Sequence, residues 1–176
     1  MVLLDHVSQG SALERYTSFL KDEIANITSE TTTVFRMQNL TGAVESYAKH
    51  AAKLQLRCSE AFKSLSMATN NPAKFTPEKT PGTPPGQLLL AKTSTDMDSC
   101  NEKLGLTERY LLLEDGLPGR PWFKHCLQAP GLDLGYAAEA FPGIQQALDQ
   151  GDYPLAQAQI DLTTERIRLA SVNLVP

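Results

Sequence analysis

The chain has 176 residues, of which 41% are hydrophobic, and it carries a formal net charge of −4. This length fits one domain with a real core, and the acidic balance argues against nucleic-acid binding, which needs clustered Lys and Arg. The longest unbroken apolar runs have about four residues, far fewer than the ~20 that span a bilayer, so we expect no direct membrane insertion.

Two helical patterns occupy the first part of the chain. Apolar residues recur at steps of three or four from Leu13 to Ile27, which predicts a helix that ends in the polar run 28–33. From Leu40 to Leu65 the same steps continue close to a heptad, over roughly 40 Å of helix. A helix this long in one small domain predicts an elongated bundle.

Residues 69–93 interrupt this pattern with five prolines and two glycines. Proline inside a helix removes a hydrogen bond and clashes with the preceding turn, so we expect a flexible insertion here. The PxxP spacing of Pro81–Pro84 leaves open a second interpretation, a ligand for a polyproline-binding module.

A third helix is predicted from Ser94 or Thr95 to Glu114, because Met97, Cys100, Leu104, Thr107 and Leu111 mark one face and the following Gly116 and Pro118 stop it. The next segment, residues 117–144, is irregular and contains the only Trp of the chain. An irregular segment with aromatic residues inside a helical protein is usually functional or docked on something.

The chain closes with a short helix, predicted from Phe141 to Asp149, and a final helix capped by Asp152. The apolar face of the final helix is assigned to Leu155, Ala158, Leu162, Arg166 or Ile167, and Ala170. No strand is predicted. The expected fold class is all-α: an antiparallel four-helix bundle with a long aromatic loop and a short extra helix between helices three and four.

No catalytic or metal-binding motif is present. Cys58, Cys100 and Cys126 are widely spaced, which leaves open buried or free thiols, one disulfide, or metal ligation. His125 and Cys126 are neighbours in sequence and are a conceivable pair of ligands, but the simpler interpretation is a packed histidine that donates a hydrogen bond to the backbone. We therefore predict no metal site and no catalytic residues in this chain.

Two Asn-x-Thr sequences begin at Asn26 and Asn39. Both lie near predicted helix ends. They are candidate N-glycosylation sites if the chain faces a lumen or the cell exterior.

The segments Leu117–His125 (LPGRPWFKH) and Tyr136–Ile144 (YAAEAFPGI) resemble the C-terminal domain of the glutamate carboxypeptidase II and transferrin receptor family. Asn39–Ala52 is similar to the long second helix of that domain, and the resemblance covers almost the whole chain outside 69–93. It implies that residues 1–176 form a single transferrin receptor-like dimerisation domain, a four-helix bundle that pairs subunits into a homodimer.

The same resemblance implies what the chain lacks. In that family the zinc ligands and the catalytic glutamate belong to the preceding, peptidase-like domain. This chain is then no enzyme by itself and holds no cofactor, and zinc is expected in the missing domain. The parent protein would be a zinc carboxypeptidase or aminopeptidase-like protein, or a receptor-like relative, anchored in a membrane with a lumenal or extracellular part.

The resemblance also assigns roles within the loop. The residues that fix the loop on the bundle and on the peptidase-like domain would be Arg120, Pro121, Trp122, Phe123, His125, Phe141, Pro142 and Gly143. Tyr136 matches a tyrosine that binds substrate in the glutamate-cleaving members. The lysine next to that tyrosine is replaced by Gly135, which cannot form a charge-assisted contact with a C-terminal glutamate.

Two other functions fit the sequence. The first is an independent helical adaptor that binds other proteins. The second is a self-contained enzyme that uses His125 and Cys126.

Overall fold

The structure is a computed structural model that describes residues 10–30, 35–70, 85–132 and 138–175. The described part is mostly helical and contains one small two-stranded sheet. The elements are α2 (Gly10–Glu30), α3 (Met37–Asn70), α4 (Pro85–Tyr110), β1 (Gln128–Pro130), β2 (Ala138–Ala140), α5 (Pro142–Asp149) and α6 (Tyr153–Asn173). None of these helices is long and apolar enough to cross a membrane.

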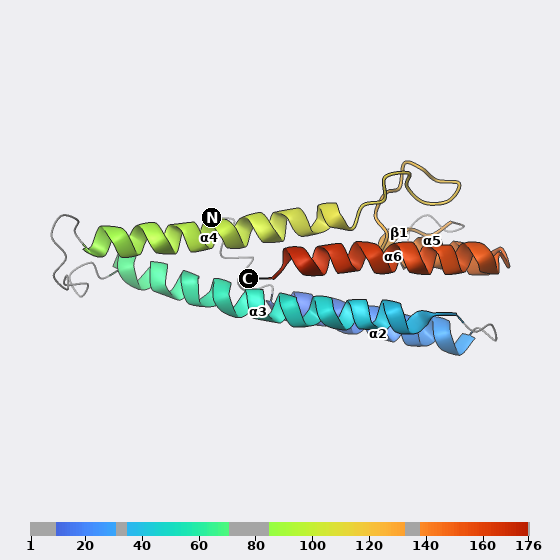
Figure 1. Ribbon diagram of the computed structural model, residues 1–176, viewed down its shortest axis with the longest axis horizontal. Coiled ribbons are helices and arrows are strands. Elements are labelled where there is room, and N and C mark those ends of the chain that lie inside the picture. The colour runs from blue at the N-terminus through green and yellow to red at the C-terminus, as the bar shows by residue number, and fades with distance from the viewer. Residues whose placement is uncertain (1–9, 31–34, 71–84, 133–137, 176) are drawn as a thin grey trace.

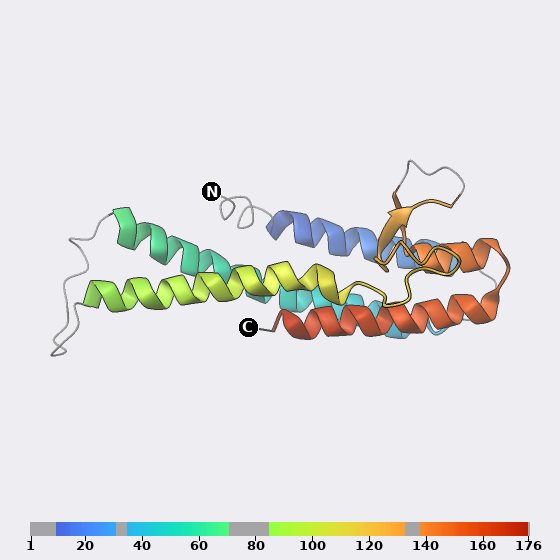
Figure 2. The same ribbon diagram turned by 90° about the horizontal axis from the view of Figure 1, so that it is seen from above.

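The long helix α3 is the centre of the arrangement. It packs against α2, α4 and α6, and α5 packs on α6. Figures 1 and 2 show that α3 and α4 continue side by side beyond the ends of α2 and α6. We call this two-helix extension, residues 58–70 of α3 and 85–100 of α4, the outer arm.

The predicted apolar stripe of α3 is confirmed, because all of its first six members are buried. These are Leu40, Val44, Tyr47, Ala51, Leu54 and Cys58. The stripe meets the buried residues Leu20, Ile24 and Ile27 of α2, and α2 ends at Glu30, inside the predicted polar run. The 3–4 spacing therefore identified the core-facing side of both helices.

The predicted insertion at 69–93 is wrong at both ends, because α3 continues to Asn70 and α4 begins at Pro85. Proline is tolerated in the first turn of a helix, where its missing N–H has no intrahelical partner to lose. The residues in between, with the Pro81–Pro84 motif, lie outside the described residues. At its other end α4 stops at Tyr110, four residues before the predicted Glu114.

The absence of strands was also predicted wrongly. Strand β1 pairs antiparallel with β2, in the register Gln128↔Ala140, Ala129↔Glu139 and Pro130↔Ala138. Each strand has three residues, which is too short for an alternating pattern to be recognised in the sequence. The fold class is therefore mostly helical rather than all-α.

The first half of α6 presents a different face from the one predicted, whereas Ile167 and Ala170 in the second half are buried as predicted. Leu155 and Leu162 are only partly buried and Ala158 is exposed. The buried positions are instead Ala156, Gln159, Ile160, Thr163 and Thr164. Apolar spacing missed this face because small and polar side chains fill it; the Thr164 hydroxyl, for example, donates to the carbonyl of Ile160 at 2.7 Å.

A candidate docking loop

Residues 111–132, called the aromatic loop from here on, fold back on themselves directly after α4. The backbone N–H of Leu113 donates to the carbonyl of Lys124 at 2.7 Å. Leu117 donates in the same way to Phe123 at 2.8 Å, and Cys126 donates to Leu111 at 3.0 Å. These three bonds tie the two sides of the loop together, which is why α4 ends before residue 114.

The turn of this loop requires a glycine at residue 116. Gly116 has a φ of +73°, which L side chains rarely adopt, and a Cβ atom there would overlap the backbone of Pro121. Two further backbone bonds close the tip, from Arg120 to Leu117 at 2.9 Å and from Phe123 to Arg120 at 3.0 Å.

Arg120 anchors the loop to the body, although it is charged and only 6% exposed. Its Nε donates to Gln146 Oε1 on α5 at 3.1 Å, and its Nη1 donates to the carbonyl of Pro130 on β1 at 2.7 Å. Gln146 in turn donates to the carbonyl of Pro118 at 2.7 Å. The guanidinium also lies 5.6 Å from the ring centroid of Phe123, within cation–π range. One buried side chain thus joins the loop, β1 and α5.

The residues at the start of α5 hold the C-terminal end of the irregular segment 117–144 in place. Phe141 is fully buried in the left-handed conformation, with φ 49° and ψ 50°, which is uncommon for a bulky residue. Its N–H donates to the carbonyl of Leu127 at 3.1 Å. Pro142 occupies the first turn of α5. A Cβ atom on Gly143 would approach Gln159 Oε1 to 2.5 Å, so this glycine lets α5 lie close to α6.

Trp122 is placed differently from these anchors. Its side chain is 70% exposed, and its ring makes a tilted contact with Phe123 at a centroid distance of 6.1 Å. Pro121 beside it is exposed as well. Of the residues predicted to fix the loop, Arg120 and Phe141–Gly143 are buried and Phe123 and His125 are partly buried, whereas Pro121 and Trp122 are exposed.

His125 accepts hydrogen bonds from the backbone, so the prediction that it donates one is wrong. The N–H groups of Leu127 and Gln128 both reach its Nδ1 at 3.2 Å. Nδ1 then carries no proton, and Nε2 donates to Glu108 Oε2 at 3.0 Å. This hydrogen bond, opposed by partial burial, holds the pKa of Glu108 below its ordinary value of 4.5.

Cys126 has the properties of a core residue rather than of a nucleophile. It is 2% exposed, and burial raises the pKa of its thiol to about 12. The thiolate is the reactive form, so little of it is present at neutral pH. Tyr47, nearby in the same buried region, has its phenol pKa raised to about 12, chiefly by burial. No group of three or more metal-ligating side chains occurs among the described residues.

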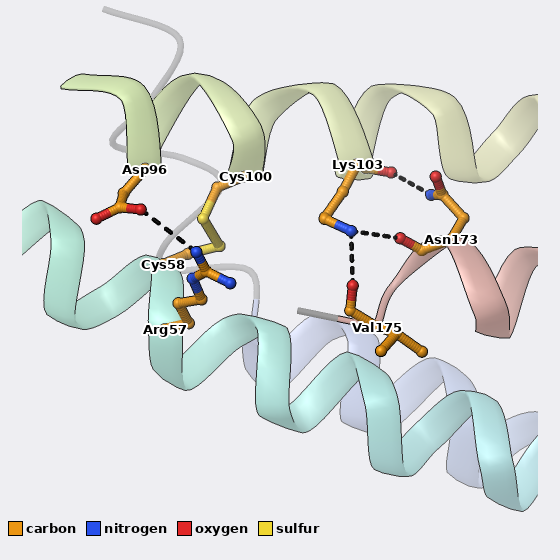
Figure 3. Close-up of a disulfide and its surroundings, with 7 residues drawn as sticks. All are labelled: Arg57, Cys58, Asp96, Cys100, Lys103, Asn173 and Val175. Carbon is orange, nitrogen blue, oxygen red and sulfur yellow. Dashed lines mark hydrogen bonds and ion pairs between the residues drawn. A yellow bond between two sulfur atoms is a disulfide. The ribbon is translucent and has the colours of Figure 1, made fainter. Parts of the chain in front are cut away.

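The other two cysteines form a disulfide that joins α3 to α4 (Figure 3). Cys58 and Cys100 are 42 residues apart in sequence, with Cα atoms 5.9 Å from each other. This resolves the three alternatives for the cysteines: one disulfide and one free, buried thiol. A signal was present in the sequence, because both residues lie on the apolar faces predicted for their helices.

Three of the predicted site residues stand apart from the loop anchors. Tyr136 and the neighbouring Gly135 lie outside the described residues. Asn26 on α2 and Asn39 on α3 are both exposed, as a glycan would require. Glu108 and Gln146 were not predicted as loop contacts, because their partners in the loop are 17 and 26 residues away along the chain.

The chain belongs to the transferrin receptor-like dimerisation domain family, whose pattern matches residues 35–175. The match includes α3 to α6 and the whole aromatic loop.

Three relatives share parts of the chain with longer proteins. A probable glutamate carboxypeptidase of Arthroderma benhamiae is 40% identical over 63 residues, 36% of this chain and 9% of that protein. A probable glutamate carboxypeptidase of Arabidopsis thaliana is 35% identical over 81 residues, 42% of this chain and 12% of that protein. An inactive zinc metalloprotease of Schizosaccharomyces pombe is 38% identical over 82 residues, with coverages of 47% and 10%. The matches thus span about a tenth of each relative's length.

Proposed function

We propose that this chain is the homodimerisation domain of a longer glutamate carboxypeptidase-like protein. The match of residues 35–175 to a dimerisation family carries the proposal. The four long helices would act together as one four-helix bundle, and part of its outer surface would meet a second copy of the chain.

The C-terminal part of the chain offers a surface for that contact. On α6, Leu169 and Val172 are 40% and 68% exposed and lie three residues apart, and Val175, two residues beyond the end of the helix, is 44% exposed. Side chains at this spacing lie on one side of a helix. Permanent dimers bury apolar surface of this kind, and a two-fold axis would bring the same stripe from both copies together.

A peptidase-like domain of the parent protein is the second proposed partner. Trp122 is the large apolar side chain most exposed among the described residues, and exposed tryptophans are frequent at the centres of protein interfaces. Zinc would be held by that domain, so the chain alone would have no peptidase activity. The parent would be an active peptidase or a catalytically inactive relative, since one of the similar proteins is named an inactive zinc metalloprotease.

Tyr136 would reach the active-site cleft of that neighbouring domain, as the resemblance implies. Gly135 supplies no positive charge beside it, so we propose that the parent does not select a C-terminal glutamate through this position. A lysine introduced by Gly135→Lys would then raise kcat/KM of an active parent for glutamate-ended peptides over neutral ones. An unchanged preference would contradict this role of the loop.

The compartment is proposed to be lumenal or extracellular. The Cys58–Cys100 disulfide supports this, because such bonds persist mainly in oxidising compartments. The exposed Asn26 and Asn39 would then carry N-linked glycans. Digestion with an N-glycosidase should lower the mass of the secreted chain, and the Asn26→Gln and Asn39→Gln variants should each lose one glycan.

Sedimentation equilibrium tests the homodimer. The 19.3-kDa chain should show twice its mass at tens of micromolar. Val172→Glu should shift the chain toward monomer, because it places a charge in the proposed apolar contact. Leu56→Glu is the matched control, since Leu56 on α3 is 67% exposed and Val172 is 68% exposed. If Leu56→Glu dissociates the dimer and Val172→Glu does not, the contact lies on another face.

A further inference from the structure

The C-terminus of α6 ends against α3 and α4, midway along those two helices (Figures 1 and 2). The last carbonyl groups of a helix have no partner within it and need one from elsewhere. Lys103 of α4 supplies it here: its Nζ donates to the carbonyl of Asn173 at 3.1 Å and to that of Val175 at 2.6 Å (Figure 3). A positive charge at this helix end also complements the helix dipole.

The same end of α6 is held from two further directions. The Nδ2 of Asn173 donates back to α4, to the carbonyl of Lys103 at 2.8 Å and to the Thr107 hydroxyl at 3.2 Å. On α3, His50 Nδ1 lies 3.0 Å from the carbonyl of Ser171 and 2.9 Å from its hydroxyl. The terminal turn of α6 therefore needs α3 and α4 at a fixed separation and register.

The Cys58–Cys100 disulfide joins α3 to α4 close to this docking point and so limits the separation of the two helices. Cys100 precedes Lys103 by three residues on α4, and Cys58 follows His50 by eight on α3, or about 4.5 and 12 Å along the helices. Beyond the disulfide lies the outer arm, where no third long helix of the described residues lies beside α3 and α4 (Figures 1 and 2). The Arg57–Asp96 ion pair beside the disulfide spans 3.3 Å, and its side chains are 46% and 33% exposed, so it contributes little.

We propose that the Cys58–Cys100 disulfide keeps α3 and α4 at the separation that the C-terminal turn of α6 requires for docking. The redox state of this bond then controls how stably that turn is bound. In the oxidised chain α3 and α4 cannot move apart at the disulfide. Lys103 and His50 therefore stay within hydrogen-bonding distance of the α6 carbonyls. In the reduced chain α3 and α4 separate more easily there, and the Lys103 cap is weakened.

The redox step is a thiol–disulfide exchange with a dithiol reductant. One reductant thiolate attacks a sulfur of the Cys58–Cys100 bond, and its second thiol then releases the mixed disulfide. Two electrons and two protons are transferred, which leaves thiols on both cysteines and an internal disulfide in the reductant. Cys126 is buried and free and takes no part.

A double-mutant cycle tests this coupling. Lys103→Met removes the charged cap but keeps a side chain of similar length. Its effect on the unfolding equilibrium constant is measured in the oxidised chain and in a Cys58→Ser/Cys100→Ser background. Two charge-assisted hydrogen bonds are lost, so we expect a change of roughly tenfold or more with the disulfide and less than about threefold without it. The control is Arg36→Met, which removes the ion pair to Asp161, twelve residues before the last residue of α6, and should act equally in both backgrounds.

Equal effects of Lys103→Met in the two backgrounds would overturn the proposal. If the double serine variant does not fold, hydrogen exchange of the wild-type chain before and after reduction gives the answer instead. At short labelling times, when amides exchange by local opening, the amides of residues 170–175 should exchange faster after reduction, whereas those of α5 should not. Unchanged exchange at 170–175, or an equal increase in α5, would contradict the proposal.

Discussion

The aromatic loop and the outer arm are held in opposite ways. The loop has no regular structure over most of its length, yet backbone hydrogen bonds join its two sides, and Arg120 ties it to β1 and α5. The arm consists of two regular helices joined at its base by one covalent bond. An irregular backbone needs separate hydrogen bonds along its length to hold one conformation. Two paired helices already satisfy their backbone hydrogen bonds internally, so one crosslink is enough to keep them together. Substitutions in and around the two regions test this difference.

Phe141→Ala should be the most destabilising change, because Phe141 is fully buried in the hydrophobic core. We expect the free energy of unfolding in urea to fall by about 3–5 kcal/mol. Trp122→Ala is the control: its side chain is 70% exposed, so the change should stay within about 0.5 kcal/mol. A large loss with Trp122→Ala would mean that this ring supports the isolated domain.

Loss of the disulfide should be the next largest effect. Cys58→Ser/Cys100→Ser frees a closed loop of 42 residues, which should cost about 2–4 kcal/mol of unfolding free energy. The measurement is urea unfolding without reductant. Addition of a dithiol should lower the stability of the wild-type chain to that of the variant and leave the variant unchanged. A response of the variant to reductant would show that another thiol is involved.

Gly143→Ala tests how closely α5 lies on α6. The added Cβ would approach Gln159 Oε1 to 2.5 Å, and the resulting shift should destabilise the chain by about 1–3 kcal/mol. Gly105→Ala in α4 is the matched control, because a Cβ there meets nothing within 4 Å. Alanine is the better helix former, so this variant should gain about 0.5–1 kcal/mol. Equal effects at the two glycines would contradict the close packing.

The Glu108–His125 contact should give the smallest effect, visible only in acid. The pKa of Glu108 is lower in the folded chain than its ordinary value of 4.5. The stability it contributes is therefore complete above about pH 4.5 and is lost as the pH falls through the lowered pKa. Glu108→Gln should flatten the stability curve below about pH 4.5. The side chain is 69% exposed, so the difference should be small, and none at all would mean the contact is not formed in solution.

The sequence predicted the parts of the fold that follow from helical spacing and capping. The α3 stripe from Leu40 to Cys58 is buried as expected, and Asp152 caps α6 by accepting from the N–H of Leu155 at 3.0 Å. These signals are local, since each depends on residues within one or two turns of helix.

The remainder depends on contacts between distant residues. Arg120 and Gln146 meet only after the loop has folded onto α5, and β1 and β2 are too short to leave a pattern. In the first half of α6 the buried face has one Ile among Ala, Gln and Thr side chains, so apolar spacing does not identify it. The left-handed backbone of Phe141 was missed because such conformations are expected of Gly or Asn.

Co-capture of two differently tagged copies tests directly whether the chain associates with itself. Two versions of the full-length parent protein, each with a different tag, would be produced in the same cells and captured through one tag. We predict that the captured material contains both versions, and that Val172→Glu in both lowers the share of the second version whereas Leu56→Glu does not. Capture of one version alone, with the wild-type sequence and the neighbouring domains present, would contradict the account.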